Sequence, residues 1–210
     1  MKLTKPILTG VVVLCVVISL LAAKAIIFYK QYSFRSQAWE RPVRSKGDPR
    51  AQIRVIEFTD FQCPACSKAA DTVEEVLKKY PGKIYFEHKY YPLAMHPFAR
   101  QASVYAECAA EQGKFWPFHD VIFRSQSSWA KMAAVDEYFS QLAVSLGVDG
   151  VRLAVCVNNP LVKEKVEKDV AEGKKLGVTS TPTFFVNGKI TVGGSNFKKA
   201  IEAIMETNAQ

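Results

Sequence analysis

Hydrophobic positions along the chain follow three different patterns. Residues 7–28 are almost continuously apolar, over a length typical of a membrane-spanning helix. Residues 53–58 and 83–91 are short runs rich in β-branched and aromatic side chains, which predicts strands. Elsewhere apolar residues recur at intervals of three and four, which predicts helices that bury one face.

The order of these elements indicates how the chain is organised. A helix predicted over 67–80 separates the two strands, and a strand, helix and strand of this length form a βαβ unit with parallel strands. Two further strands, 183–186 and 189–192, flank Asn187-Gly188, a dipeptide typical of a tight hairpin turn. The other predicted helices cover residues 98–113, 115–123, 135–146, 151–157, 160–176 and 197–205.

Two strands, a helical block, a hairpin and a final helix can share one sheet only if the block is an insertion. We therefore expect an α/β fold with a central mixed sheet flanked by helices and an inserted all-helical subdomain. The expected domain covers residues 51–208, in which 51–91 and about 161–208 contain the sheet and about 92–160 form the insertion. About 160 residues are enough for one hydrophobic core.

The N-terminal part of the chain is expected to anchor it. Residues 1–28 are predicted as a signal-anchor with a transmembrane helix over 7–28, and cleavage after Ala25 is the alternative. Residues 29–50 are polar and basic, contain proline and glycine, and show no sustained period. This composition predicts a flexible tether.

Charge is concentrated at the N-terminal end. The first fifty residues hold nine Lys and Arg against two acidic residues, and residues 51–210 hold nineteen against eighteen, so 7 of the net +8 belongs to the tail. The nearly neutral domain does not favour nucleic-acid binding. Basic residues after the apolar stretch oppose export, but long domains translocate regardless of such charges. The cysteine content favours an oxidising compartment, because disulfides persist there. We therefore expect a cell-envelope protein with its domain on the periplasmic or extracytoplasmic side of the cytoplasmic membrane.

Cys63 and Cys66 are candidate redox residues. They follow the first predicted strand, so Cys63 falls at the start of a helix, where unpaired N–H groups and the helix dipole stabilise a thiolate. Pro64 fits the first helical position. An inert disulfide and half of a zinc site are the alternatives, but structural zinc needs a second close pair of ligands, which the sequence lacks. We expect a dithiol that closes and reopens a disulfide, with no metal and no cofactor.

Three motifs accompany the dithiol and the helical block. They are Glu57-Phe-x-Asp-Phe-x-Cys63-Pro64-x-Cys66, Gly113-Lys-Phe-Trp116 and Val178-x-x-Thr181-Pro182-Thr-Phe-Phe-Val-Asn-Gly188. Over about residues 50–208 the chain thus resembles thiol:disulfide oxidoreductases of the DsbA-like branch of the thioredoxin superfamily. The resemblance implies a thioredoxin fold.

The resemblance also implies roles for the matching residues. Cys63 corresponds to the nucleophile and Cys66 to the resolving cysteine. Pro182 corresponds to a cis-proline beside the dithiol, with Thr181 presenting its backbone to an extended substrate; a trans proline that opens an edge strand is the alternative. Glu57 corresponds to a buried acid that moves the proton of the second cysteine, unless its side chain points to solvent.

The two residues between the cysteines, Pro64 and Ala65, are expected to tune the redox potential. Ala65 stands where strongly oxidising relatives have histidine. Without an imidazole near the thiolate, we expect a potential between those of DsbA and thioredoxin, about −120 and −270 mV.

The remaining candidates lie in the predicted insertion. Cys108 and Cys156 are 48 residues apart, and similar pairs in relatives imply a structural disulfide; two buried free thiols are the alternative. His96 lies where the insertion joins the sheet, and it is expected either to border the substrate groove or to be structural. His119 is expected to pack among aromatic residues on a helix.

The expected function is the introduction of disulfides into exported, cysteine-containing client proteins. As the family implies, a quinone-linked membrane oxidase would reoxidise the dithiol. The alternative is a reductase or isomerase of the cell envelope, kept reduced by a membrane electron donor, for instance for cytochrome maturation. A non-catalytic binding module is a third hypothesis, which the intact Cys63-Cys66 pair disfavours.

Overall fold

The structure is a computed structural model that describes residues 19, 21–24 and 44–207 and divides the chain into two units, residues 1–41 and 42–210. In the first unit, residues 21–24 are helical and exposed. None of the described helices is long and apolar enough to cross a membrane. Most of the predicted signal-anchor, the position after Ala25 and the tether up to residue 43 lie outside the described residues, and these assignments stay predictions.

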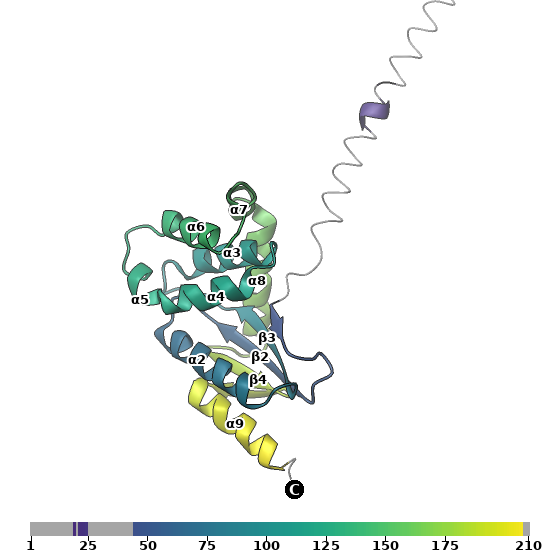
Figure 1. The fold of residues 1–210 in the computed structure, drawn as a ribbon, viewed down its shortest axis with the longest axis vertical. Coiled ribbons are helices and arrows are strands. Elements are labelled where there is room, and N and C mark those ends of the chain that lie inside the picture. Colours follow the sequence, from purple (N-terminus) through teal and green to yellow (C-terminus); the bar gives the residue numbers. More distant parts are fainter. Residues whose placement is uncertain (1–18, 20, 25–43, 208–210) are drawn as a thin grey trace, which may run out of the picture. The chain divides into compact units, whose positions relative to one another are not determined.

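A five-stranded mixed sheet organises the second unit (Figure 1). The strands are β1 (Ser45–Lys46), β2 (Ile53–Thr59), β3 (Ile84–Tyr90), β4 (Thr183–Val186) and β5 (Lys189–Val192). Their order is β1-β3-β2-β4-β5, in which β2 and β3 are parallel and the other neighbouring pairs are antiparallel. The central strand β2 leads directly to the dithiol, so the sheet fixes where Cys63 lies.

Helices cover both faces of the sheet. α2 (Pro64–Lys79) and α9 (Gly194–Thr207) share a hydrophobic cluster with one face, and α8 (Pro160–Lys175) packs Val170 with Phe58 on the other. Because β2 is covered on both sides, it is mostly buried, as its continuous apolar pattern predicted.

The insertion lies between β3 and α8 and is described throughout. Its helices are α3 (Ala99–Ala110), α4 (Phe115–Arg124), α5 (Gln126–Trp129), α6 (Asp136–Ser145) and α7 (Gly150–Val157). They gather beyond one end of the sheet (Figure 1). Their common core contains buried aromatic side chains such as Phe118, Trp129 and Phe139. The sequence did not predict α5, because four residues are too few to show a helical period.

The β4–β5 hairpin has the bounds that the sequence predicted. Asn187 and Gly188 both adopt positive φ, 46° and 81°, as the two-residue turn of such a hairpin requires. The dipeptide therefore sets the register of β4 against β5, and with it the position of the preceding Thr181-Pro182 turn.

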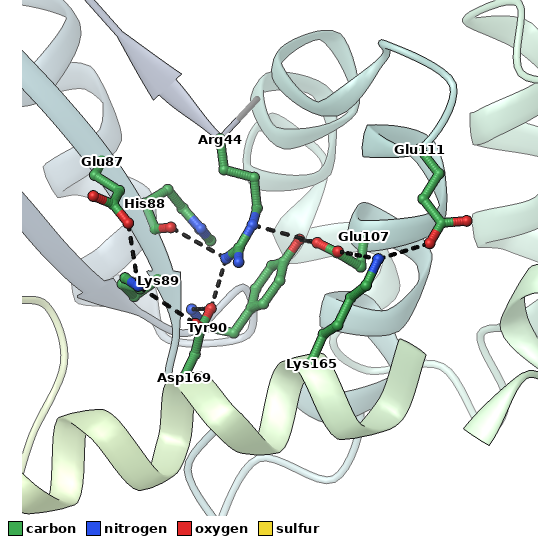
Figure 2. Close-up of polar contacts among 9 residues, drawn as sticks. All are labelled: Arg44, Glu87, His88, Lys89, Tyr90, Glu107, Glu111, Lys165 and Asp169. Atoms are coloured by element: carbon green, nitrogen blue, oxygen red, sulfur yellow. Dashed lines mark hydrogen bonds and ion pairs between the residues drawn. The ribbon is translucent and has the colours of Figure 1, made fainter. Parts of the chain in front are cut away.

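The folded domain begins before residue 51, the boundary expected from the sequence. β1 belongs to the segment assigned to the flexible tether, but it pairs with β3, and the Arg44 side chain beside it is only 17% exposed. Figure 2 shows the Arg44 guanidinium between Asp169 of α8 and Glu107 of α3, at N···O distances of 2.6 and 3.3 Å. Composition missed this boundary because one residue that pairs with distant carboxylates produces no periodic pattern.

Other groups extend the Arg44 network across β3, α3 and α8. The Arg44 guanidinium lies 4.4 Å from the centre of the Tyr90 ring, and the Tyr90 hydroxyl donates to Glu107. Lys165 lies 3.2 Å from Glu107 and 2.8 Å from Glu111 (Figure 2). Buried charges tolerate desolvation only when they are paired and hydrogen-bonded, so this network ties the insertion to the sheet.

Candidate active site at the Cys63-Cys66 dithiol

The dithiol lies at the first turn of α2. Cys63 is the N-cap residue, with extended dihedral angles of −75° and 121°, and Pro64 occupies the first turn. Pro64 and Ala65 are exposed, whereas the Cys66 side chain is fully buried behind them. Proline is favoured here because its fixed φ suits the helix and the N–H that it lacks would be unpaired. Among the described residues, Cys63 and Cys66 are the free cysteines, and no cluster of metal-ligating side chains is found.

The environment favours the thiolate of Cys63. A hydrogen bond from the Cys66 thiol is the largest contribution and lowers the pKa of Cys63 to about 5. Partial burial opposes this shift, and Thr181 and the backbone N–H groups of Cys66 and Ala65 add to it. Donors at a helix N-terminus stabilise negative charge, so Cys63 is the more acidic member of the pair.

Cys66 has the opposite character. Burial raises its pKa well above that of an ordinary thiol, and the neighbouring Cys63 raises it further. The reduced pair therefore holds one thiolate, on Cys63, and one protonated thiol, on Cys66. In thiol–disulfide exchange a thiol of low pKa leaves readily. This asymmetry therefore suits a dithiol in which Cys63 is the leaving group when a mixed disulfide with another thiol is broken.

A turn from the other end of the domain faces Cys63. The peptide bond between Thr181 and Pro182 is cis, as the resemblance implied, and the Thr181 carbonyl oxygen lies 3.5 Å from the Cys63 sulfur. β4 begins immediately after this turn and pairs with β2. The sheet thus brings together the two motifs that the sequence separates by more than a hundred residues.

Glu57 lies on β2, on the face that α2 covers. Its neighbours across the sheet are His88 of β3 and Phe184 of β4, and its side chain is 3% exposed. Burial raises the pKa of Glu57 to about 8. The alternative of a solvated, outward-pointing Glu57 is therefore wrong.

Polar side chains from the insertion hold the segment before Cys63. Gln126 of α5 donates to the carbonyl oxygens of Phe61 and Cys63, at 2.8 and 3.0 Å. In return, the side-chain amide oxygen of Gln62, Oε1, accepts from the backbone N–H of Phe98 at 2.7 Å. Sequence reasoning missed these contacts, because no local pattern links residues so far apart along the chain.

Asp60 and His96 form a second contact of this kind. Asp60 is fully buried, and its carboxylate lies 2.7 Å from His96 Nδ1 and accepts from the N–H groups of Gln62 and Leu93. The structure thus places His96 on the loop that enters the insertion, linked to Cys63 through Asp60, whose carbonyl oxygen accepts from the Cys63 N–H. Its expected substrate contact stays a prediction.

Cys108 and Cys156 form a disulfide that joins α3 to α7. Both residues lie in the buried core of the insertion. The bridge that the resemblance implied is therefore present in the structure, and it belongs to the insertion rather than to the dithiol.

The dithiol at the start of α2, the cis-proline turn opposite it and the mixed sheet define the class: a thioredoxin-fold protein with a helical insertion. The pattern of the thioredoxin family matches residues 41–206. The chain belongs to the thioredoxin family.

Curated relatives include much longer proteins. The Na⁺/H⁺ antiporter NhaA of Herminiimonas arsenicoxydans is 31% identical over 164 residues, which are 78% of this chain and 25% of that protein. NhaA 3 of Salinispora tropica is 33% identical over 165 residues, which are 78% of this chain and 24% of that protein. The chain therefore spans about a quarter of the length of these relatives.

Solved structures share the fold. α-DsbA1 of Wolbachia pipientis has a TM-score of 0.66 at 23% identity, covering 76% of this chain and 89% of that one. BdbD of Bacillus subtilis has a TM-score of 0.67 at 24% identity, with 77% and 92% covered. DsbA2 of Pseudomonas aeruginosa has a TM-score of 0.64 at 22% identity, with 77% and 93% covered. These similarities confirm the DsbA-like thioredoxin fold predicted from the sequence.

Proposed function

We propose that this protein is a thiol:disulfide oxidoreductase that introduces disulfides into exported client proteins through Cys63 and Cys66. The observation that carries the proposal is the asymmetric dithiol: burial keeps Cys66 protonated while hydrogen bonds favour the Cys63 thiolate. The thioredoxin family and the structural similarity to proteins named DsbA and BdbD support the same chemistry. The curated relatives carry an antiporter name, and the redox function is proposed for the segment that they share with this chain.

The reaction consumes one client dithiol. A client thiolate attacks the Cys63 sulfur, the Cys63–Cys66 bond breaks, and Cys66 leaves and takes up a proton. The second client thiol then loses its proton and attacks the client sulfur of the mixed disulfide, and Cys63 leaves as a thiolate. Two electrons pass from the client to the Cys63-Cys66 pair, and the client gains a disulfide.

The direction of this exchange follows from the stability of the reduced pair. A thiolate that the site stabilises makes the reduced form favourable and therefore makes the disulfide an oxidant. Ala65 provides no imidazole beside Cys63, so we expect a potential between about −120 and −270 mV, the values of DsbA and thioredoxin. Equilibration of the dithiol with glutathione measures it, and a value below that of thioredoxin excludes an oxidase.

The proposed location is the cell envelope, with the domain on the extracytoplasmic side of the cytoplasmic membrane. The apolar residues 7–28 support an anchored chain, and the paired cysteines support the extracytoplasmic side, although the basic residues after the apolar stretch oppose export. A quinone-linked membrane oxidase is the proposed acceptor of the electrons from Cys63 and Cys66. In the alternative reductase or isomerase, a membrane donor would instead supply electrons to the pair.

The redox state of Cys63 and Cys66 in growing cells tests the direction of electron flow. Cells are quenched with acid, free thiols are alkylated, and the state of Cys63 and Cys66 is read from the mass change. A mostly oxidised pair supports the oxidase, and a mostly reduced pair supports the reductase. The Cys66→Ala variant should accumulate mixed disulfides with client proteins, whereas the matched Cys63→Ala variant should not. Absence of these adducts from Cys66→Ala would favour a non-catalytic binding module.

A further inference from the structure

A pocket of about 310 Å³ lies between α2 and α4, and neither Cys63 nor Cys66 belongs to its lining. Glu57 of β2, Ser67 of α2 and the neighbouring His119 and Asp120 of α4 belong to its lining. A pocket of this volume holds several water molecules, which need polar partners such as these. It therefore offers Glu57 a route to solvent that does not pass the client side of Cys63.

Glu57 needs this pocket to satisfy its carboxyl group. The side chain is 3% exposed, and burial is the sole cause of its raised pKa of about 8, since none of the described residues forms a hydrogen bond with it. A buried carboxyl without a protein partner is costly unless water supplies its hydrogen bonds. The pocket that Glu57 lines has room for water, which can supply those hydrogen bonds.

His119 and Asp120 of α4 form a polar pair in the lining of the same pocket. His119 is buried, and its Nδ1 lies 2.8 Å from Asp120 Oδ1. Burial would raise the pKa of Asp120, but the hydrogen bond from His119 and the charges of His119, Lys46 and Arg124 outweigh it and lower the pKa. The carboxylate accepts only, so the proton of neutral His119 is on Nδ1. Its Nε2, which has no partner in the described part of the chain, can take a proton from water.

Asp120 connects this pair to bulk solvent, because its side chain is 41% exposed. His88, the neighbour of Glu57 on β3, lies on the inner side, with its ring centre 5.5 Å from that of His119. Burial lowers the pKa values of both histidines, so the pair is neutral at rest. The other charged groups that line the pocket are Lys46 of β1, Asp71 and Glu74 of α2, and Arg124 of α4.

We propose that His119 and Asp120 are the proton relay that connects Glu57 to solvent during disulfide exchange. The proposal rests on the proposed function and adds to it two positioning residues that do not touch the client. It follows from the geometry: a buried carboxyl, a pocket with room for several water molecules, and in the same lining a histidine whose partner carboxylate reaches solvent.

The relay operates when the disulfide is reduced. As the Cys63–Cys66 bond breaks, Cys66 leaves as a thiolate and takes the proton of Glu57. A solvent acid, either hydronium or a buffer acid, gives a proton through pocket water to Nε2 of His119, which forms an imidazolium beside the Asp120 carboxylate. The imidazolium then passes this proton through water to the Glu57 carboxylate, and the conjugate base of the acid stays in the solvent. Glu57 is thus protonated again, and one proton from solvent has reached Cys66. The reverse sequence returns the proton when the pair is reoxidised.

Single-turnover reduction of the oxidised full chain by dithiothreitol tests the relay. His119→Asn keeps a donor for Asp120 but cannot titrate, and Asp120→Asn removes the charge that stabilises the imidazolium. Each variant is expected to slow reduction about tenfold under conditions where proton transfer limits the rate. This is less than the 10²–10⁴-fold effect of direct general acid–base catalysis, because water alone still delivers some protons to Glu57. The solvent deuterium isotope effect should increase and the pH profile of the rate should change.

Two comparisons separate a relay from a structural role. Asp71→Asn makes the same charge change in the pocket lining. Asp71 and His119, both in the described part of the chain, form no hydrogen bond or ion pair with each other, so this variant should leave the rate unchanged. In His119→Ala, added imidazole should restore the rate, because the pocket admits a small titratable molecule. The glutathione potential of each variant should match that of the unaltered protein, since a relay changes rates and not equilibria.

The relay is refuted if His119→Asn and Asp120→Asn both reduce at the unaltered rate with the unaltered pH profile and isotope effect. The relay is also overturned if imidazole does not restore the rate of reduction and the glutathione potential of the variant is shifted. That result would indicate that His119 has a packing role. If His119→Ala does not fold, Asp120→Asn, at a half-exposed residue, decides the question. Failure of the unaltered protein to exchange with glutathione would instead refute the proposed function.

Discussion

The carbonyl oxygen of Thr181 lies 3.5 Å from the sulfur of Cys63, across 118 residues of sequence. β2 leads to Cys63, β4 follows Pro182, and the two strands are antiparallel neighbours, so the sheet sets this distance. On the other side, Gln126 of the insertion donates to the Phe61 and Cys63 carbonyl oxygens. The dithiol is therefore held between the sheet and the insertion.

Replacing Cys66 by alanine is expected to raise the pKa of Cys63 above about 5. The hydrogen bond from Cys66 is the largest contribution that lowers this pKa, and Thr181 and backbone N–H groups remain to keep it below that of a free thiol. Thiolate ultraviolet absorbance followed against pH measures the shift. Cys63→Ala is the matched control and should show no acidic thiolate, and an unchanged pKa in Cys66→Ala would contradict the assignment.

The reduced protein is expected to gain stability over the oxidised protein as the pH rises from about 5 towards about 9. Cys63 titrates near 5 when folded and near 9.0 as an ordinary thiol, so between these values the unfolded chain binds more protons. The contribution is fully present above the unfolded pKa and is lost as the pH falls through 5. Urea unfolding of both forms across this range measures the difference, which should increase with pH.

Glu57→Gln is expected to stabilise the protein by about 3 kcal/mol near pH 7. Folded Glu57 keeps its proton up to about pH 8, whereas the unfolded residue ionises near 4.5, so the stability that its protonation contributes is complete below 4.5 and is lost as the pH rises through 8. Glutamine has no such dependence. Urea unfolding at pH 7 and at pH 4.5 checks the prediction, because the gain in stability should vanish near pH 4.5. An equal gain at both pH values would show that Glu57 has an ordinary pKa.

Arg44→Ala is expected to lower the free energy of unfolding by about 3 kcal/mol, since it leaves the buried Asp169 carboxylate without its closest cation and the buried Glu107 carboxylate with Lys165 alone. Denaturant unfolding measures the loss. Arg50→Ala is the matched control: Arg50 also pairs with an aspartate, Asp48, but its side chain is 90% exposed, and its removal should have no measurable effect. Equal behaviour of the two variants would show that the Arg44 network contributes nothing.

Replacing Cys108 and Cys156 together by serine is expected to lower the free energy of unfolding by about 2–4 kcal/mol, because the bridge restricts the unfolded chain. The pKa of Cys63 should stay near 5, since the bridge joins α3 to α7 and does not contact the dithiol. Unfolding of the variant under non-reducing conditions, with a parallel titration of Cys63, measures both. A shifted Cys63 pKa would show that the insertion has rearranged around Gln126.

Local patterns in the sequence account for most of the elements. Asn159 and Pro160 place the start of α8, because the Asn159 side chain caps the helix and proline fits its first turn. Asn187-Gly188 places the end of β4 and the start of β5, because it forms the hairpin turn. β1 and α5 were missed because each is too short to show a period. The Arg44 pairing that fixes β1 joins residues 125 apart, a distance at which no local pattern operates.

By itself, the sequence determined the order of the elements, the insertion and the placement of Cys63 at the start of a helix, because strand, turn and helix-capping preferences act between near neighbours. The tertiary structure alone decided that Cys66 is buried and adds a hydrogen bond to the Cys63 thiolate, that Glu57 is buried, and that Glu57, His119 and Asp120 line one pocket. These properties depend on burial and on charges and donors brought together through space, and residues such as Cys63 and Thr181 meet only when the sheet has formed.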